Sequence, residues 1–199
     1  MRTIKKVASH IFIDGFGGMT QGLFATLIIG TMIQQIGLLI GGSTGNVIYL
    51  LGKAAAALTS AGIGVGVAVK YGESPLVTVS AAVAAMVGGY AGKITGGTFF
   101  VDGNAVLAGP GEPLGAFIAA FAGITCGHLV SGKTKVDIIV TPVITIGAGS
   151  VVGLLVGPPI SQMMTGLGSI INWATEQRPF IMGIVVSVVM GMVLTLPIS

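Results

Sequence analysis

The side chains best suited to chemistry in this sequence gather in one polar segment near the middle of the chain. Asp102 and Asn104 lie in the letters "FFVDGNAV", and Glu112 lies in "GPGEP". A carboxylate accepts paired hydrogen bonds and an amide both donates and accepts them, as a solute rich in hydroxyl groups requires. We therefore expect Glu112, with Gly111 and Pro113 on either side of it, to bind a small polar solute. Asp102 and Asn104 either complete this polar pocket or form a turn.

Two further polar residues, Asp14 and Gln21, lie in "DGFGGMTQG" near the amino terminus. They either cap the junction between two helices, which we favour, or face the solute site. No Ser-His-Asp, metal-ligand or Walker-type pattern is present, so we expect no catalytic residue, metal or cofactor in this chain. We interpret His128 as an interfacial or packing residue. Cys126, the single cysteine, is interpreted as a packing residue, since it has no partner for an internal disulfide.

The elements that position these residues are membrane helices. Of the 199 residues, 53% are hydrophobic and 8% are charged, whereas soluble domains contain roughly 25% charged residues. So few polar side chains could not cover the surface of a soluble fold. The net charge of +3 comes from scattered Lys and Arg residues, which argues against a nucleic-acid-binding face. We predict an all-α, polytopic transmembrane helical bundle in contact with lipid.

About 20 mostly apolar residues cross the hydrocarbon core of a bilayer, and the sequence offers about six such stretches. They are Met19–Ile40, Val47–Val69, Ser74–Gly92, Leu114–Val130, Ile138–Ile160 and Phe180–Ile198. No fixed repeat or low-complexity linker divides them, so we predict one domain over residues 1–199. Residues 1–18 are too interrupted to span, and their helical spacing of apolar and basic residues indicates an interfacial helix or a simple anchor.

The basic residues indicate an orientation. If the amino terminus is cytoplasmic, two basic residues face outward, Lys93 and Arg178, and the larger group faces inward, namely Arg2, Lys5, Lys6, Lys70, Lys133 and Lys135. The positive-inside rule therefore favours both termini in the cytoplasm. Lys53, within the second span, either snorkels to the outer surface or pairs with a carboxylate in the bundle.

Glycine occupies 34 positions, well above its ordinary share near 7%. Small residues four apart let helices approach closely in lipid, a spacing found in Gly88/Gly92/Gly96, Gly123/Gly127 and Gly149/Gly153/Gly157. We expect a tight bundle packed through these faces. Irregular glycines in "GLLIGGSTGN" and "SAGIGVGVAVKYG" predict turns or broken helices. Pro142 predicts a kink, and Pro158 with Pro159 predicts the end of a span.

The polar segment Thr95–Pro113 needs a special place in such a bundle. At membrane depth a segment of this kind is tolerated only where it is buried in protein or lines a wet cavity. Its length suits a re-entrant hairpin of two half-helices, as transporters use at substrate sites. An ionisable residue carried into the bundle is functional by default, because its burial is costly. The alternative is an ordinary loop outside the membrane.

Several stretches also resemble a known family. "GPGEP" resembles the Gly-x-x-Glu-Pro signature of the IIC membrane subunits of the bacterial phosphoenolpyruvate-dependent phosphotransferase system. "SHIFIDGFGGMTQGLFATLIIGTMIQQIG", "GGTFFVDGNAVLAGPGEPLGAFIAA" and "RPFIMGIVVSVVMGMVLTLPIS" resemble the IIC-like (EIIC-like) proteins labelled toxin regulators of the PfoR type. IIC proteins are generally longer, which leaves open that the chain is a fragment or a half-length form. Their glutamate motif lies later in the chain, so Glu112 is either its equivalent or an analogue.

The resemblance implies a permease subunit of the bacterial inner membrane that binds and translocates a small polar solute, a sugar. The glutamate of the motif would bind a sugar hydroxyl, and separate soluble phosphotransferase components would supply the phosphoryl group. A homo-oligomer is expected. Two alternatives stay open, namely a membrane sensor or regulator that binds solute without moving it, and a structural half-unit that needs a partner chain.

Overall fold

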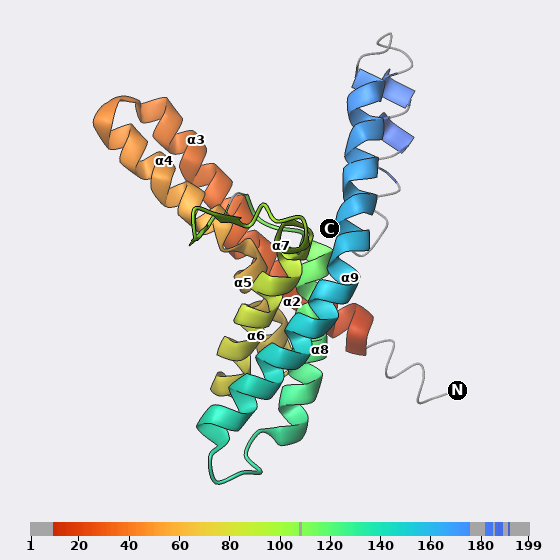
Figure 1. The fold of residues 1–199 in the computed structure, drawn as a ribbon. Coiled ribbons are helices and arrows are strands. Elements are labelled where there is room, and N and C mark those ends of the chain that lie inside the picture. Colours follow the sequence, from red (N-terminus) through yellow and green to blue (C-terminus); the bar gives the residue numbers. More distant parts are fainter. Residues whose placement is uncertain (1–9, 108, 176–181, 185, 189–190, 192–199) are drawn as a thin grey trace.

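The computed structural model describes residues 10–107, 109–175, 182–184, 186–188 and 191. Figure 1 shows helices almost throughout, which confirms the predicted all-α membrane bundle. The elements are η1 (His10–Gly15), α2 (Phe16–Leu23), η2 (Phe24–Ile28), α3 (Ile29–Ile40), α4 (Gly42–Ala57), α5 (Thr59–Lys70), α6 (Pro75–Gly89), α7 (Ala91–Thr95), β1 (Phe100–Val101), β2 (Asn104–Ala105), α8 (Pro113–Val130) and α9 (Asp137–Thr175).

Apolar helices match most of the predicted spans. Among the described residues, three helices are long and apolar enough to cross a membrane, Ile13–Ile40, Pro113–Val130 and Asp137–Trp173. Helices α4 and α5 together form a fourth candidate, bent by 52° at Leu58, and α6 is a shorter apolar helix. Most of the predicted span Phe180–Ile198 lies outside the described residues.

The first helix is continuous from His10 to Ile40, through η1, α2, η2 and α3. Its apolar part begins at Ile13, earlier than the predicted start at Met19. Residues 1–9, half of the predicted interfacial helix, lie outside the described residues. Gly41 and Gly42 then turn the chain with φ of 66° and 63°, so the turn expected from "GLLIGGSTGN" is confirmed.

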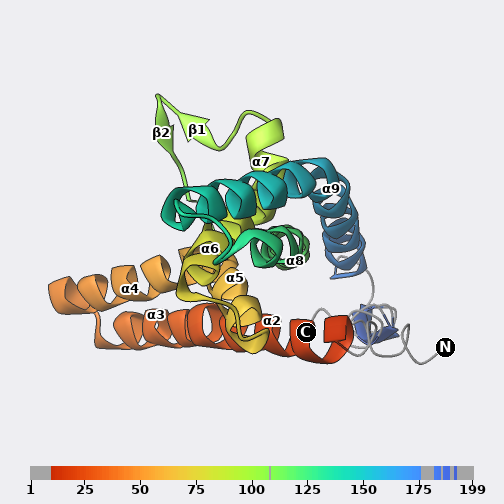
Figure 2. The same cartoon turned by 90° about the horizontal axis from the view of Figure 1, so that it is seen from below.

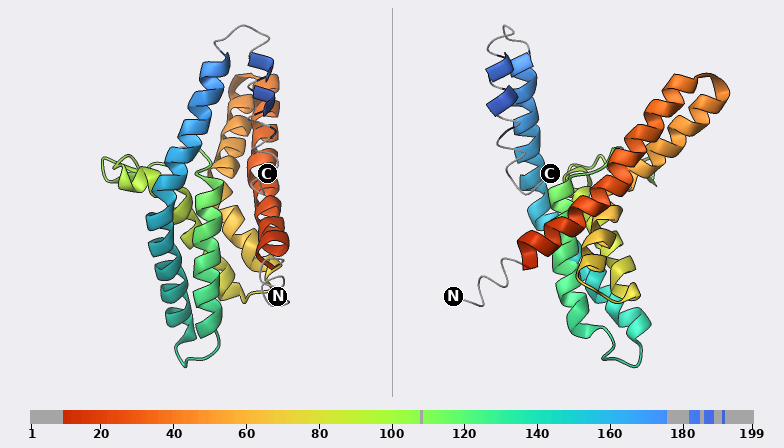
Figure 3. Two further views of the ribbon diagram at one scale, coloured as in Figure 1. Left: turned by 90° about the vertical axis from the view of Figure 1, so that its right-hand side faces the viewer. Right: turned by 180° about the vertical axis from the view of Figure 1, so that it is seen from behind.

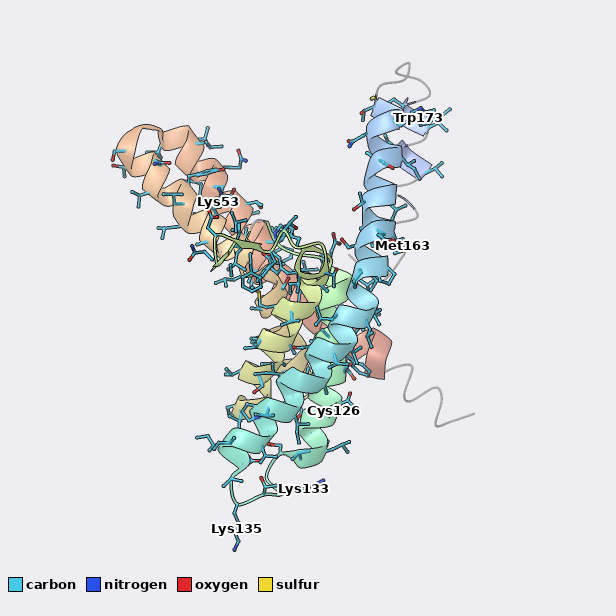
Figure 4. The ribbon with its side chains drawn as sticks, in the orientation of Figure 1. Lys53, Cys126, Lys133, Lys135, Met163 and Trp173 are labelled. Carbon is cyan, nitrogen blue, oxygen red and sulfur yellow. The ribbon has the colours of Figure 1, made fainter. Side chains whose placement is uncertain are left out.

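Two turns lie at one end of the bundle. The α5–α6 turn and the carboxyl end of α8 meet there, since the hydroxyl oxygens of Ser74 and Ser131 are 3.1 Å apart. A Cβ on Gly17 would lie 3.8 Å from Cε of Lys70, so the first helix also begins near this end. Figure 4 shows Lys133 and Lys135 in the α8–α9 loop at the same end of the molecule.

Small residues form the contacts between α6, α8 and α9. A Cβ on Gly153 would lie 2.8 Å from Cα of Gly88 and 2.9 Å from Cβ of Ala119, distances that real Cβ atoms do not reach. Gly149 is equally close to Ala119 and Ala84 of α8 and α6. These contacts confirm the predicted glycine faces, although Gly96 meets only the backbone of its own turn.

Two arms rise beyond this compact part. Figures 1 and 3 show the α3–α4 hairpin and the second half of α9 extending past the level of the β1–β2 segment. Large apolar side chains are exposed on both arms, including Leu39 at 87% and Trp173 at 55%. Such surfaces suit contact with lipid rather than water.

Helix α9 corrects one prediction. Pro158 and Pro159 do not end a span, because the helix continues through them to Thr175. Figure 2 shows that α9 bends between its two halves instead. Proline already has a helical φ, so it can lie inside a helix. Its energetic cost comes from the missing backbone N–H and from the bend. Membrane helices tolerate this cost when neighbouring groups satisfy the carbonyls that lose their helical partner.

Candidate functional site

The segment before α8 is anchored to the bundle by hydrogen bonds across long sequence distances. The hydroxyl of Ser60, on α5, donates to the carbonyl of Pro110 at 2.9 Å. The hydroxyl of Tyr90 donates to the carbonyl of Gly109 and is 3.3 Å from that of Ala57. Both donor residues are buried, at 0% and 1% exposure, whereas Gly109 is exposed and Pro110 is half-buried. These bonds fix the segment against the break between α4 and α5.

Gly111 makes the close approach possible. Its φ is +76°, a conformation that residues with a side chain rarely adopt. A Cβ there would also lie 3.1 Å from the carbonyl oxygen of Gly89 and still closer to Ser60. The next amide, of Glu112, donates to the same Gly89 carbonyl at 2.7 Å. The backbone bend at Glu112 therefore rests on a glycine and on the end of α6.

Glu112 is the N-cap residue of α8, and Pro113 occupies the first helical turn. Proline is favourable there because its missing N–H would have no helical partner. The Glu112 side chain makes no capping hydrogen bond to the helix, so its carboxylate oxygens are not used by α8. The positive end of the helix dipole still favours the negative charge.

A cavity of about 260 Å³ opens beside Glu112. Its lining comes from α6, α7, the segment before α8, and α9, through Gly89, Gly92, Lys93, Pro110, Gly111, Glu112 and Ser161. A carboxylate, an ammonium and a hydroxyl thus face one space. Nζ of Lys93 lies 5.3 Å from the ring centroid of Tyr90, within the range of a cation–π contact. This set can both accept from and donate to the hydroxyl groups of a polar solute.

The other predicted residues lie elsewhere. Asp102 and Gly103 form the tip of the β1–β2 hairpin, with φ of 51° and 78°, and Asn104 follows them in β2. Asp102 and Asn104 are both exposed. This arrangement is typical of a two-residue hairpin turn. The expected pair of half-helices is therefore wrong here, because consecutive positive φ values reverse the chain into strands. Neither Asp102 nor Asn104 is among the residues that line the Glu112 cavity.

Asp14 and Gln21 do not line the cavity either. Asp14 lies in η1 near the end of α5, where burial and then the charge of Asp14 raise the pKa of Tyr71 to about 12. The Tyr71 phenol therefore stays protonated over the physiological range. Gln21 is exposed on α2. The predicted junction between two helices is instead one uninterrupted helix at this point.

Sequence reasoning missed Ser60, Tyr90, Lys93 and Ser161. Ser60 and Tyr90 donate hydrogen bonds to backbone carbonyls that lie 50 and 19 residues further along the chain. No local sequence pattern indicates such distant partners. Lys93 was assigned to the outer surface by the charge count. One feature of the sequence does indicate that Lys93 lies near the site. It comes three residues after Tyr90 and directly after Gly92, which belongs to a predicted glycine face.

A second polar feature lies at the opposite end of α8. Nδ1 of His128 is 2.9 Å from a carboxylate oxygen of Glu73. The His128 side chain is 70% exposed and that of Glu73 is 9% exposed. His128 thus joins the α5–α6 turn to the end of α8, which fits an interfacial residue better than a buried packing residue.

Comparison with protein families decides the class. The family model described as "Phosphotransferase system, EIIC" matches residues 13–199. The chain belongs to this EIIC family. It is accordingly a membrane permease component of a phosphotransferase system and works with the other components of that system. Neither a curated protein nor a solved structure matches the chain.

The EIIC match covers the Glu112 site, its anchors and both arms. It confirms the IIC resemblance that "GPGEP" suggested. The finer assignment to the PfoR-type branch stays a prediction, since the family model is broader than that branch.

Proposed function

We propose that this EIIC chain binds a sugar in the Glu112 cavity and carries it across the bacterial inner membrane in a phosphoenolpyruvate-dependent phosphotransferase system. The observation that carries the proposal is the cavity itself, where Glu112, Lys93 and Ser161 converge beside a backbone bend held by Ser60 and Tyr90. Sugar recognition needs several fixed donors and acceptors, and this cavity supplies both kinds.

The depth of the cavity supports transport rather than surface binding. Helix α6 has 15 residues, which rise about 22 Å, less than the roughly 30 Å of the hydrocarbon core. The cavity at its end therefore falls within the core if α6 starts at one surface. Figure 1 agrees, because both arms continue well beyond the level of this segment. A polar segment at this depth favours a re-entrant solute site over an outer loop.

Orientation follows from the charges. The α5–α6 turn and the α8–α9 loop share one end and carry Lys70, Lys133 and Lys135. We place this end in the cytoplasm by the positive-inside rule. Solute bound near Glu112 would then be released toward the soluble phosphotransferase components that phosphorylate it, with this chain supplying binding and passage.

The test is Glu112→Gln, which keeps the shape of the side chain, removes its charge and exchanges an acceptor for a donor. A hydrogen bond to a charged group contributes roughly 1.5–3 kcal/mol, so sugar affinity should fall roughly ten- to hundredfold. Binding of labelled sugars to purified protein and uptake into cells are measured together, with size-exclusion chromatography to check folding.

Asp102→Asn is the matched control, because it removes a carboxylate from the exposed hairpin of the same segment. Its affinity and uptake should equal those of the unmodified protein. If Glu112→Gln binds and transports normally, the site assignment is wrong. Retained binding without any uptake by the unmodified protein would instead favour a solute-sensing regulator.

A further inference from the structure

A second cavity, of about 480 Å³, lies next to the Glu112 cavity. Gly92 and Ser161 line both spaces, so they form the wall between them. A Cβ on Gly92 would lie 2.7 Å from Oγ and 2.8 Å from Cβ of Ser161. The two cavities therefore adjoin across a glycine and a single hydroxymethyl group.

The polar side chains that line the second cavity are uncharged. Beyond Ser161 its polar side chains are Thr95, Gln162 and Thr165. Thr95 donates its hydroxyl hydrogen to the carbonyl of Ala91 at 2.9 Å, and Thr165 donates to that of Ser161 at 2.8 Å. Their oxygens remain able to accept, and the Gln162 amide can do both. This lining suits a neutral group rich in O–H donors, whereas a phosphate or carboxylate would find no cation among these side chains.

Size decides how the two cavities are used. The Glu112 cavity, at about 260 Å³, falls below the roughly 300–1,000 Å³ of typical small-molecule sites. The second cavity, at about 480 Å³, falls within that range by itself. The adjoining pair therefore has room for a solute longer than one sugar ring.

We propose that this second cavity, which Gln162 lines, is a second subsite and that the solute is a disaccharide, or a neutral glycoside of similar length. One ring occupies the Glu112 cavity, and the second ring lies across the Gly92–Ser161 wall against Gln162 and Thr165. This inference rests on the proposed sugar-binding function and adds the substrate class.

The test compares labelled glucose, maltose and cellobiose for binding to the purified full chain in detergent. At least one disaccharide should bind about tenfold or more tightly than glucose. Gln162→Leu removes the amide and should weaken disaccharide binding about three- to tenfold, as expected for one or two neutral hydrogen bonds. Glucose binding should not change, because glucose occupies only the first cavity. Gln35→Leu, on an exposed face of α3, is the matched control.

Each outcome separates this inference from the function on which it rests. Glu112→Gln should weaken both glucose and disaccharide binding, since both use the first cavity. If it does so while Gln162→Leu leaves every sugar unaffected, or weakens glucose equally, the second subsite is refuted and the sugar function stands. Tighter binding of glucose than of both disaccharides also refutes the subsite. If neither disaccharide binds, the second subsite is refuted whether or not glucose binds.

Discussion

Tyr90 offers the most direct test of the idea that a fixed backbone bend creates the site. Tyr90→Phe removes one hydroxyl and keeps the ring that packs 5.4 Å from the ring of Phe99. The carbonyls of Gly109 and Ala57 lose their donor. Tyr90 is 1% exposed, whereas Gly109 is exposed and Ala57 is half-buried, so water can reach part of the freed carbonyl groups. The expected cost is that of one typical intramolecular hydrogen bond, about 0.5–1.5 kcal/mol.

This cost falls on the conformation that binds solute. If the bend opens in the variant, the population competent for binding decreases, and apparent sugar affinity falls by about two- to tenfold. Ser60 still bonds Pro110, so the segment should loosen rather than detach. Hydrogen–deuterium exchange should therefore increase at Glu112, whose amide donates to Gly89, together with the fall in sugar affinity.

Tyr49→Phe is the control for this experiment, because Tyr49 lies on α4 beside the Gly41–Gly42 turn and lines a different cavity. It should change neither exchange at Glu112 nor sugar affinity. If Tyr90→Phe leaves both quantities unchanged while the protein stays folded, the bend does not depend on this hydroxyl and the reasoning is refuted.

Two further predictions concern the bundle. Gly153→Leu should lower the thermal stability of the purified protein much more than Val151→Leu, because Gly153 is against Gly88 whereas Val151 is 59% exposed; equal melting temperatures would discard this packing face. In a Cys126→Ala background, a cysteine placed at position 133 should react with impermeant thiol reagents only from the cytoplasmic side. Labelling of position 133 from outside would contradict the proposed orientation.

Much of the fold is predictable from sequence because it depends on local composition. Apolar length identifies the spans, and glycines four apart identify the faces through which α6, α8 and α9 approach. The turn at Gly41 and Gly42 follows from the residue type, since both have positive φ. The same local reasoning failed at Pro158 and Pro159, because a proline pair can end a helix or bend it. Which occurs depends on the contacts that follow.

The site is only partly predictable for the opposite reason. Glu112 stands out locally, as a carboxylate between two prolines in an apolar chain. Its surroundings come from residues distant in sequence, such as Ser60 and Ser161, which reach the cavity only after α5 and α9 have packed. Asp102 looked like a partner because it is near in sequence, yet the hairpin turn carries it away from the cavity.

Lys93 belongs both to the candidate site and to the charge pattern from which the orientation was predicted. The charge count placed it outside with Arg178, but the structure places its side chain in the wall of the Glu112 cavity, over the ring of Tyr90. An ammonium at this depth is tolerated because a carboxylate and an aromatic face share the same space. It is then no longer a surface charge and does not belong in the orientation count. Removing it leaves outside only Arg178, together with Lys53 where that side chain snorkels outward, so the charge bias that favours a cytoplasmic Lys133 becomes stronger.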